Sequence, residues 1–450
     1  METPICDFVR DYAESGTLRL HMPGHKGTPL LGPEHLDITE ISGADSLYEA
    51  DGIIARSERN AGRLFGCRTL YSAEGSSQCI RAMLYLAQLR AREQGRRPRI
   101  AAGRNAHKTF LTALGLLDIP VMWLYPREND NYLSCCLTPS ELDTYLSEAE
   151  DPPTAVYLTS PDYLGNVADI RGISQVCHRH GVLLLVDNAH GAYLRFLPES
   201  RHPMDLGADL CCDSAHKTLP VLTGGAYLHL SDEMDAAVGD QAKNALMLFG
   251  STSPSYLILQ SLDMANRYLE ALPRLLTEYL PCVARLKERL TGHGYRLYGD
   301  EPLKITVETK PFGYTGDALA DLLREKGMEP EFADRDHLVL MLTPALGTDA
   351  PERIGEALCA VQPRNPITVC APSFSRAAQA LSIRDAMLSP SEVQPVGQCI
   401  GRILAVPTVG CPPAVPILVC GERIDDHAAE CFRYYGIADC CVVKEFPYES

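Results

Sequence analysis

The sequence predicts an α/β fold, with a mostly parallel sheet covered by helices and a smaller C-terminal α+β domain. From about residue 55 to residue 187, short apolar runs alternate with amphipathic segments of helical length. This order is typical of parallel sheets with crossover helices. The run 182–186 has no polar alternation, so both of its faces are expected to be buried.

The expected elements of the larger domain follow one another in regular alternation, after a first helix at 54–66. Strands are expected at 69–72, 99–103, 121–126, 155–160 and 182–187, with helices at 78–93, 112–117, 139–150 and 169–181 between them. In an open sheet of this kind, ligands bind at the carboxyl ends of the strands. Candidate functional residues are therefore sought at those ends.

The chain of 450 residues is too long for one typical core. We expect an N-terminal arm (1–55), a large domain (56–290) and a small C-terminal domain (291–450). Ser253 and Pro254 predict the start of a long helix that ends near residue 290. In the small domain, strands are expected at 303–309 and 337–343, helices at 315–327 and 351–361, and a last strand at 417–421 after a proline-rich segment.

The composition narrows the classes of partner and the compartment. A formal net charge of −17 disfavours nucleic acid and anionic membranes as partners, because the dominant field repels phosphate. No apolar run approaches the roughly 18 residues that a membrane span needs. The 17 cysteines include no C-x-x-C pair, and the N-terminus is polar and acidic. We expect a reducing cytoplasm and assign no metal ligands.

Asp187 ends the apolar run 182–187 and precedes Asn-Ala-His-Gly. A carboxylate next to a buried strand needs a partner, because its desolvation alone is costly. A protonated heteroaromatic nitrogen would be such a partner. Alternatively, Asp187 caps the following turn.

Lys217 lies between an apolar run at 210–212 and a strand-like run at 226–230. Its neighbours are hydroxyls and a histidine, His216, and it falls at the same predicted sheet edge as Asp187. A lysine amine becomes a nucleophile when its pKa is depressed, and then forms a Schiff base with a carbonyl. Alternatively, Lys217 is a solvated surface charge.

Gly75, Ser76 and Ser77 stand between an expected strand and an expected helix. Backbone N–H groups at a helix N-terminus, together with hydroxyls, form an anion site, although a serine N-cap explains the same loop. A phosphate site, an amine for an aldehyde and a carboxylate for a ring nitrogen together describe the requirements of pyridoxal 5'-phosphate. His107 is placed to stack on that ring, or is a satisfied loop histidine.

Several segments in order along the chain resemble the orn/lys/arg decarboxylases, which are fold-type I pyridoxal-phosphate enzymes with the aspartate aminotransferase architecture. The segments are LHMPGHKG (20–27), DSLYEADGII (45–54), RNAHKT (104–109), SPDYLGNVAD (160–169), VDNAHGAY (186–193), SAHKTLPVLTGG (214–225), STSPSY (251–256), ALSIRDAMLSPSEV (380–393) and CPPAVPILVCGE (411–422). The resemblance covers nearly the whole chain.

The resemblance implies a role for each candidate residue. Lys217 would carry the cofactor, Asp187 would pair with its ring nitrogen, and His107 would stack on the ring. The phosphate would be held by Ser76, Ser77, Ser214 and His216, with Thr252 or Ser253 reaching it from a second subunit. His190 and Ser160 would lie near the cofactor, and His216 or Lys217 would return a proton to the substrate carbon.

The implied reaction is decarboxylation of a basic amino acid, with arginine ahead of lysine and ornithine, to an amine of the kind used in polyamine biosynthesis. An aminotransferase or side-chain lyase on the same fold is the alternative, followed by a catalytically silent relative. The chain starts directly with the arm, so a homodimer with shared active sites is expected instead of a higher assembly.

Departures from the family pattern leave the substrate open. Gly224 stands where the family continues Leu-Thr-Gln, and Cys411, Ala414 and Cys420 replace the usual Tyr, Gly and Pro. The phosphate loop reads AEGSSQ in place of the common Asn-Gly-Ser/Thr form. The acid that reads the distal cation of the substrate is not fixed by the sequence, and Glu329, Glu331 and Asp334 are candidates.

Overall fold

The computed structural model describes residues 1–126, 131–411 and 415–445. They form two compact units, which are described separately. The first comprises Met1–Arg97 and Ile170–Glu278, and the second comprises Pro98–Asp169 and Tyr279–Ser450. The domain bounds 1–55, 56–290 and 291–450 remain a prediction.

The first unit contains four strands in the order β1 (Arg68–Ser72), β7 (Ala226–Leu230), β6 (Leu210–Asp213) and β5 (Leu183–Asp187). Strands β5 and β6 are parallel, whereas β7 runs antiparallel to both of its neighbours. The regular strand–helix alternation did not predict this reversal. It arises because the chain turns back after the four-residue helix α7 (Ala215–Thr218), with no long crossover helix between β6 and β7.

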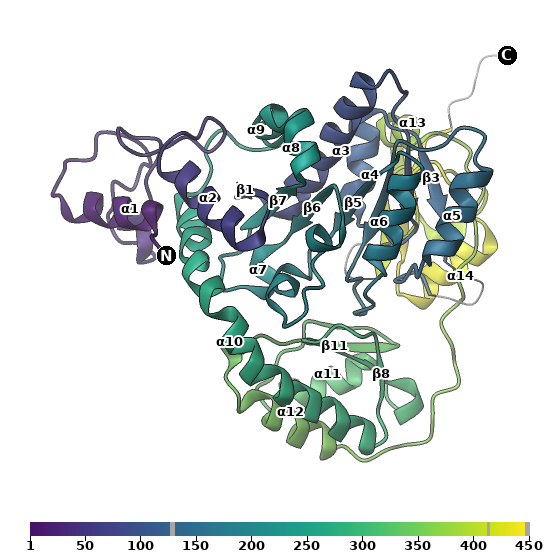
Figure 1. The fold of residues 1–450 in the computed structure, drawn as a ribbon. Coiled ribbons are helices and arrows are strands. Elements are labelled where there is room, and N and C mark those ends of the chain that lie inside the picture. Colours follow the sequence, from purple (N-terminus) through teal and green to yellow (C-terminus); the bar gives the residue numbers. More distant parts are fainter. Residues whose placement is uncertain (127–130, 412–414, 446–450) are drawn as a thin grey trace. The chain divides into compact units, whose positions relative to one another are not determined.

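Helices pack on these strands (Figure 1). They are α2 (Ile53–Phe65), α3 (Gly75–Glu93), α6 (Ile170–Arg179) and α8 (Asp232–Val238), while α9 (Ala242–Met247) packs on α3. Helix α3 contacts β1, β5, β6 and β7 through an apolar face that includes Cys79, Met83 and Leu86. This contact fixes the N-terminus of α3 relative to the strand ends that hold the candidate residues.

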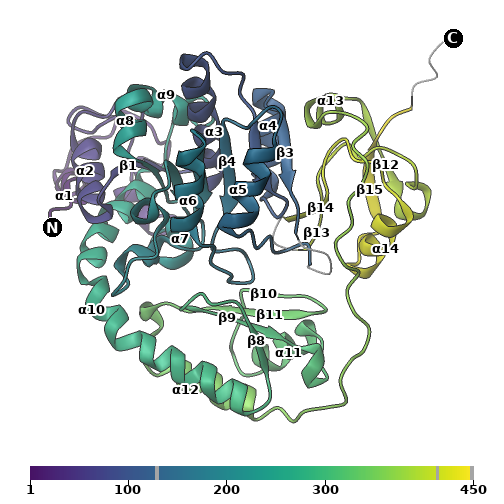
Figure 2. The same cartoon turned by 45° about the vertical axis from the view of Figure 1, so that its right-hand side comes forward.

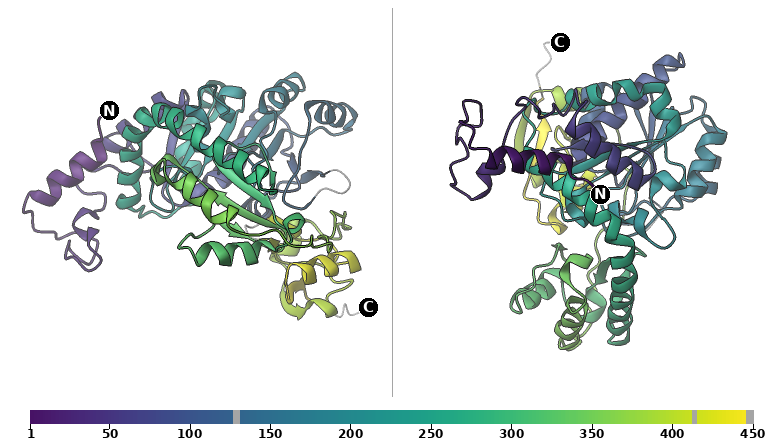
Figure 3. Two further views of the ribbon diagram at one scale, coloured as in Figure 1. Left: turned by 90° about the horizontal axis from the view of Figure 1, so that it is seen from below. Right: turned by 60° about the vertical axis from the view of Figure 1, so that its left-hand side comes forward.

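The N-terminal helix α1 (Pro4–Glu14) lies by the start of the long helix α10 (Tyr256–Gly292), as Figure 3 shows, and Asp263 of α10 binds it. The Asp263 carboxylate accepts the backbone N–H groups of Ile5 and Cys6 at 2.9 and 3.0 Å. These are two of the N–H groups that a helix start leaves without an intrahelical partner. The long helix predicted from Ser253 and Pro254 is confirmed, although it begins two residues later, at Tyr256.

The second unit contributes three parallel strands in the order β4 (Ala155–Thr159), β2 (Ile100–Gly103) and β3 (Val121–Leu124). Helices α4 (Lys108–Leu117) and α5 (Pro139–Glu148) connect them along the chain. Thr138 and Glu141 form a reciprocal capping box at the start of α5. The predicted order of strands and helices is confirmed here, as are the α/β class and the mostly parallel sheet.

A separate antiparallel sheet of this unit has the order β10 (Phe332–Ala333), β11 (His337–Met341), β9 (Lys304–Glu308) and β8 (Arg296–Tyr298) (Figure 2). Helices α11 (Gly316–Arg324) and α12 (Ala350–Cys359) accompany it. The strands and helices predicted between residues 303 and 361 are therefore confirmed.

The C-terminal part differs from its prediction. It contains α13 (Ile383–Leu388), β12 (Ser391–Pro395), β13 (Thr408–Cys411), β14 (Val415–Leu418), α14 (Asp426–Tyr434) and β15 (Asp439–Val443). The expected last strand corresponds to β14, but β15 follows it and pairs with β12. Both strands are short, and Val393 is flanked by polar residues in β12, so the hydrophobic pattern alone did not reveal this strand. Ala414 lies outside the described residues.

Within the described part of the chain, none of the helices combines the length and the apolar character that crossing a membrane requires.

Candidate active site

Lys217 lies on α7, between the carboxyl end of β6 and the start of β7. Its side chain is half-buried, and its Nζ lies 3.0 Å from Nε2 of His190. The backbone N–H of Lys217 donates to the carbonyl of Ser214 at 3.0 Å, which fixes the short helix to the strand end. The amine therefore lies next to an imidazole that can exchange a proton with it.

Asp187 is the last residue of β5 and is 2% exposed. It lies in register with Cys212 on β6. Its Oδ1 accepts the N–H of Ala189 at 3.2 Å and the thiol of Cys212 at 3.7 Å. The turn-capping role that the sequence left open is thus present, and the same turn places His190, which is 5% exposed, three residues further on.

The first turn of α3 lies at the end of β1. Gly75 adopts φ +74°, and the hydroxyl of Ser214 donates to that of Ser76 at 2.8 Å. Ser76 and Ser77 are half-buried. The first turn of a helix presents backbone N–H groups and the positive end of the helix dipole, so this position favours an anion.

Gly224 closes the loop beside this turn. Its carbonyl accepts the N–H of Gly75 at 2.6 Å, and its φ is +101°. A Cβ at this position would lie 3.0 Å from the carbonyl oxygen of Ala73. The departure from the family's glutamine is therefore a backbone requirement in this chain, because the loop approaches the start of α3 too closely for a side chain.

His216 is bound through its own loop. Its Nδ1 donates to the carbonyl of Gly225 at 3.0 Å, and its backbone N–H donates to the same carbonyl at 3.2 Å. These two bonds fix the orientation of the half-buried imidazole and place a proton on Nδ1.

Thr252 and Ser253 lie in an exposed segment before α10. The N–H of Ser253 donates to Ser251 Oγ at 3.1 Å, and the N–H of Ser251 donates to the carboxylate of Glu74. The expectation that Thr252 or Ser253 reaches the phosphate of a second subunit remains a prediction.

His107 and Ser160 belong to the second unit, after the carboxyl ends of the paired parallel strands β2 and β4. His107 is the N-cap of α4, and its Nδ1 accepts the N–H of Thr109 at 3.2 Å. Ser160 is 2% exposed, and its Oγ accepts the N–H of Ala168 at 3.0 Å. Both residues lie at one edge of this strand group, as predicted, and their roles toward a cofactor remain a prediction.

The three candidate acids for a distal cation differ in their surroundings. Glu329 pairs with Arg324 at 2.9 Å, and Asp334 accepts the backbone N–H groups of a turn at Asp336 and His337. Glu331 is exposed and accepts the hydroxyl of Tyr163 at 3.5 Å. Glu329 and Glu331 also line a hollow of about 390 Å³.

Sequence reasoning missed a buried polar cluster at the same strand ends. It joins Asp213, the last residue of β6, to His202, His229 and Asn188. The first and the last of these residues are 41 positions apart in the sequence, so spacing gives no sign that they meet. The available signal was Asp213 itself. It is a carboxylate at the end of an otherwise apolar strand, and Ser214 directly follows it.

Comparisons with known proteins agree with this architecture. A family model described as Orn/Lys/Arg decarboxylase, major domain, matches residues 3–294. An arginine decarboxylase from Bacillus subtilis is 28% identical over 463 residues, covering 95% of this chain and 92% of its own length.

Solved structures share the fold. A lysine decarboxylase from Francisella novicida has a TM-score of 0.76 and 15% identity, covering 98% of this chain and 81% of that one. A structure described as SPT with PLP has a TM-score of 0.53 and 13% identity, covering 68% of this chain and 75% of that one. Since the family model spans more than half of the sequence, the chain belongs to the Orn/Lys/Arg decarboxylase family and is an amino-acid decarboxylase.

Proposed function

We propose that this enzyme uses pyridoxal 5'-phosphate to decarboxylate a basic amino acid, arginine in the first place, to the corresponding amine and carbon dioxide. The observation that carries the proposal is the 3.0 Å contact between Lys217 Nζ and His190 Nε2, because His190 belongs to the turn that starts at the buried Asp187. The contacting amine and imidazole and the buried carboxylate thereby all belong to the adjoining ends of β5 and β6.

The residues present fit the cofactor. The start of α3, with the linked hydroxyls of Ser76 and Ser214, supplies donors for a phosphate. Lys217 supplies an amine for the aldehyde, and Asp187 supplies a buried carboxylate for a protonated ring nitrogen. When bound, the cofactor would act as the sink for the electrons released as carbon dioxide leaves. His107, Ser160, His190 and His216 remain proposed contacts.

The side chains of this chain would handle the protons. The Lys217 amine must lose a proton to act as a nucleophile, and His190 Nε2 is within hydrogen-bond distance to receive it. After carbon dioxide leaves, the substrate carbon takes a proton from Lys217 or His216. Because His216 is bound to the Gly225 carbonyl through Nδ1, its Nε2 is the nitrogen available for that role.

The choice of arginine is supported by the arginine decarboxylase that matches this chain over 95% of its length. A substrate with a distal cation also agrees with the net charge of −17. Of the candidate acids, Glu331 is favoured for the distal group, because Glu329 is already paired with Arg324 and Asp334 is engaged in a turn.

The proposed assembly is a homodimer with shared active sites. The arm exposes five large apolar side chains: Leu18 by 79%, Leu20 by 84%, Met22 by 53%, Leu30 by 80% and Leu31 by 92%. Exposed apolar side chains so close together in the sequence are typical of a segment that another chain covers. The described cysteines are free thiols, which agrees with the proposed reducing cytoplasm.

The experiment is a product profile. Purified enzyme with pyridoxal phosphate is incubated with arginine, lysine or ornithine, and carbon dioxide and agmatine, cadaverine or putrescine are measured. Agmatine is expected to form fastest, and the Lys217→Ala variant serves as the matched control. Absence of an amine from all three substrates would contradict the proposal, and keto-acid formation would favour an aminotransferase.

A further inference from the structure

A fully buried charge cluster lies under the strand ends that carry the candidate active site. Asp213 ends β6, His229 lies on β7, and His202 precedes the short helix Pro203–Leu206. All three side chains have 0% exposure. Because none of them reaches solvent, their hydrogen bonds and charges must be balanced within the cluster.

The Asp213 carboxylate has a partner for each of its acceptor positions. Oδ2 lies 3.0 Å from Nε2 of His202 and 3.1 Å from Nε2 of His229. Oδ1 accepts the amide of Asn188 at 2.7 Å and the thiol of Cys211 at 3.8 Å. Four donors from four positions in the sequence therefore converge on one side chain.

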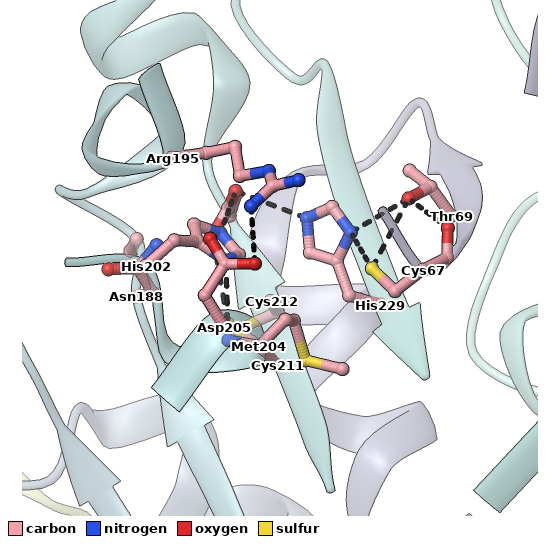
Figure 4. A network of polar contacts seen from close by, with 12 residues as sticks. Cys67, Thr69, Asn188, Arg195, His202, Met204, Asp205, Cys211, Cys212 and His229 are labelled. Atoms are coloured by element: carbon pink, nitrogen blue, oxygen red, sulfur yellow. Dashed lines mark hydrogen bonds and ion pairs between the residues drawn. The ribbon is translucent and has the colours of Figure 1, made fainter. Parts of the chain in front are cut away.

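The hydrogen bonds also assign the protons of the two imidazoles. Figure 4 shows the imidazole of His229 with Thr69 and Cys67 beside it. The hydroxyl of Thr69 donates to the carbonyl of Cys67, so its oxygen accepts from His229 Nδ1 at 2.9 Å. With Nε2 donating to Asp213, His229 carries two protons and a positive charge.

His202 differs from His229 in its second nitrogen. Its Nδ1 accepts the backbone N–H of Met204 at 3.3 Å, so its single proton is on Nε2, facing Asp213. The Asp213 carboxylate is thus paired with a protonated His229, and His202 donates to the same carboxylate through Nε2.

The electrostatics agree with an ionised Asp213 that is paired with His229. Burial opposes the ionised form of Asp213, but His202 and His229 outweigh it and hold the pKa of that carboxyl well below its ordinary value. Burial likewise opposes the charged form of His229, but the Asp213 carboxylate outweighs it and raises the pKa of the imidazole.

The cluster is connected to the site through its neighbours in the chain. Asn188, which donates to Asp213, directly follows Asp187, and its backbone N–H donates to the Cys212 carbonyl at 2.9 Å. Ser214, which directly follows Asp213, binds both Ser76 and the backbone of Lys217. Movement of Asp213 would therefore move the groups proposed for the ring nitrogen, the phosphate and the aldehyde.

The turn that bears His190 is held by the same amide. A Cβ at Gly191 would lie 2.0 Å from Asn188 Oδ1. The backbone of the turn thus packs directly on the side chain that Asp213 orients, and His190 is carried with it.

We propose that Asp213 is a positioning residue: paired with a protonated His229, it holds the ends of β5 and β6 so that Asp187, Ser214 and Lys217 are aligned for the reaction. The inference rests on the proposed function, since alignment is defined toward the cofactor. A metal site is the competing interpretation, because ligand atoms of His202, Cys211 and Asp213 lie within 4.8 Å of one another.

The test compares Asp213→Asn with Asp209→Asn. Asp209 lies just before the other end of β6, is 4% exposed, and accepts the N–H of Leu184 at 2.7 Å and His178 Nε2 at 3.1 Å. It is a matched control because it is also a buried carboxylate with a histidine partner, and it lies next to the same strand. For each cofactor-free variant, urea unfolding and the dissociation constant of pyridoxal phosphate are measured, followed by kcat and KM with arginine.

Both variants are expected to unfold at lower urea concentration than the wild type. Asp213→Asn is expected to raise the cofactor dissociation constant at least about tenfold and to lower kcat by up to about 10²-fold, with KM within about threefold. Asp209→Asn should leave the three site parameters within about twofold. Equal effects of the two variants on these parameters would overturn the proposal.

Charge balance gives a second, independent arm. Asp213→Asn leaves the His229 cation buried without its anion, so the double variant Asp213→Asn/His229→Gln, which removes both charges, should unfold later and bind cofactor more tightly than Asp213→Asn. If the single variant does not fold, the double variant is compared with Asp209→Asn in its place. A double variant no better than the single one would overturn the charge pair.

Two further outcomes are distinguishable. Stoichiometric zinc or another transition metal in the purified wild type would overturn the hydrogen-bonded assignment in favour of the metal site. If the wild type forms no amine from any basic amino acid, the proposed function fails, while the cofactor dissociation constants still decide the role of Asp213.

Discussion

A buried aspartate lies at each end of strand β6, Asp209 just before it and Asp213 as its last residue, but the pKa values of the two carboxyls are shifted in opposite directions. Burial is the dominant influence at Asp209 and raises the pKa of its carboxyl, because its one imidazole partner, His178, is half exposed to solvent. At Asp213 two fully buried imidazoles outweigh burial and lower the pKa. The comparison teaches that the set of partners, and not the depth of burial alone, determines the direction in which the pKa of a buried carboxyl is shifted.

The same strand ends differ in what surrounds them. The Asp209 end binds a backbone N–H of β5 and one helix residue, which is a purely structural arrangement. The Asp213 end continues into Ser214 and Lys217 and adjoins Asp187. Substitutions at the two ends should therefore separate effects on activity from effects on stability.

The largest expected effect is at Lys217. Lys217→Ala should lower kcat by at least about 10³-fold, because both the nucleophile and a proton donor are lost. The measurement is agmatine formation together with the visible absorption of the cofactor. Asp209→Asn is the control and should keep both, and a Lys217→Ala enzyme with an unchanged spectrum would mean that another lysine carries the cofactor.

A smaller loss is expected at Asp187. Asp187→Asn keeps the shape and the turn but removes the charge proposed to hold a proton on the ring nitrogen. We expect kcat to fall by about 10²- to 10³-fold, with little change in the urea midpoint. The measurement is steady-state kinetics of Asp187→Asn and of Asp209→Asn. Equal kcat values of the two variants would contradict a functional difference between the strand ends.

Gly224→Gln tests the loop beside the start of α3. Restoring the family's glutamine should cost about 1–3 kcal/mol of unfolding free energy, because the residue has φ +101° and its Cβ would lie 3.0 Å from the Ala73 carbonyl. Urea unfolding and inorganic phosphate binding are the measurements. A variant as stable as the wild type would show that the loop can move away. The control is Gly181→Ala, which tests the left-handed backbone alone. Gly181 is exposed, has φ +65°, and has nothing within 4 Å of the position that a Cβ would take.

The smallest effect is the pH dependence of unfolding. The lowered pKa of Asp213 stabilises the fold above the unfolded value of about 3.9, and that stabilisation is lost as pH falls through the folded pKa. The raised pKa of His229 stabilises the fold below about 6.5, and this is lost as pH rises through the folded pKa. The advantage of the wild type over Asp213→Asn/His229→Gln should therefore be greatest between about pH 4 and 6.5.

The opposite end of the strand should show the opposite trend. Because the pKa of Asp209 is raised, its contribution to stability falls as pH rises from about 3.9 through the folded pKa. The wild type should thus lose stability relative to Asp209→Asn over that window. Urea midpoints measured from pH 4 to 8 check both trends, and parallel curves for the two variants would contradict the opposite pKa shifts of the two carboxyls.

Much of the fold could be predicted, because apolar runs and helical periodicity are local signals. The strands ending at Ser72 and Asp187 and the helix at α3 follow directly from them. The reversal of β7 and the pairing of β15 with β12 could not be predicted, since they depend on tertiary pairing of short segments. His107 and Ser160 were brought into the candidate site by their positions after predicted strands, and the family resemblance then implied roles for them.

The site was predictable to the same extent. Asp187, Ser214 and Lys217 fall at strand ends, where the topology itself draws attention to them. Asp213 was overlooked because its importance comes from His202 and His229, whose positions relative to it are set by the fold and not by spacing. Gly224 was recognised as a departure, but its cause became clear only from the approach of the Ala73 carbonyl.

The central claim, that Lys217 carries the cofactor at the Asp213 end of β6, has one direct measurement. Holoenzyme is treated with borohydride to fix the Schiff base, digested, and analysed by mass spectrometry for the pyridoxyl-modified peptide. We predict modification of Lys217 and its loss in the Lys217→Ala variant. Modification of another lysine, with Lys217 unmodified, would contradict the account.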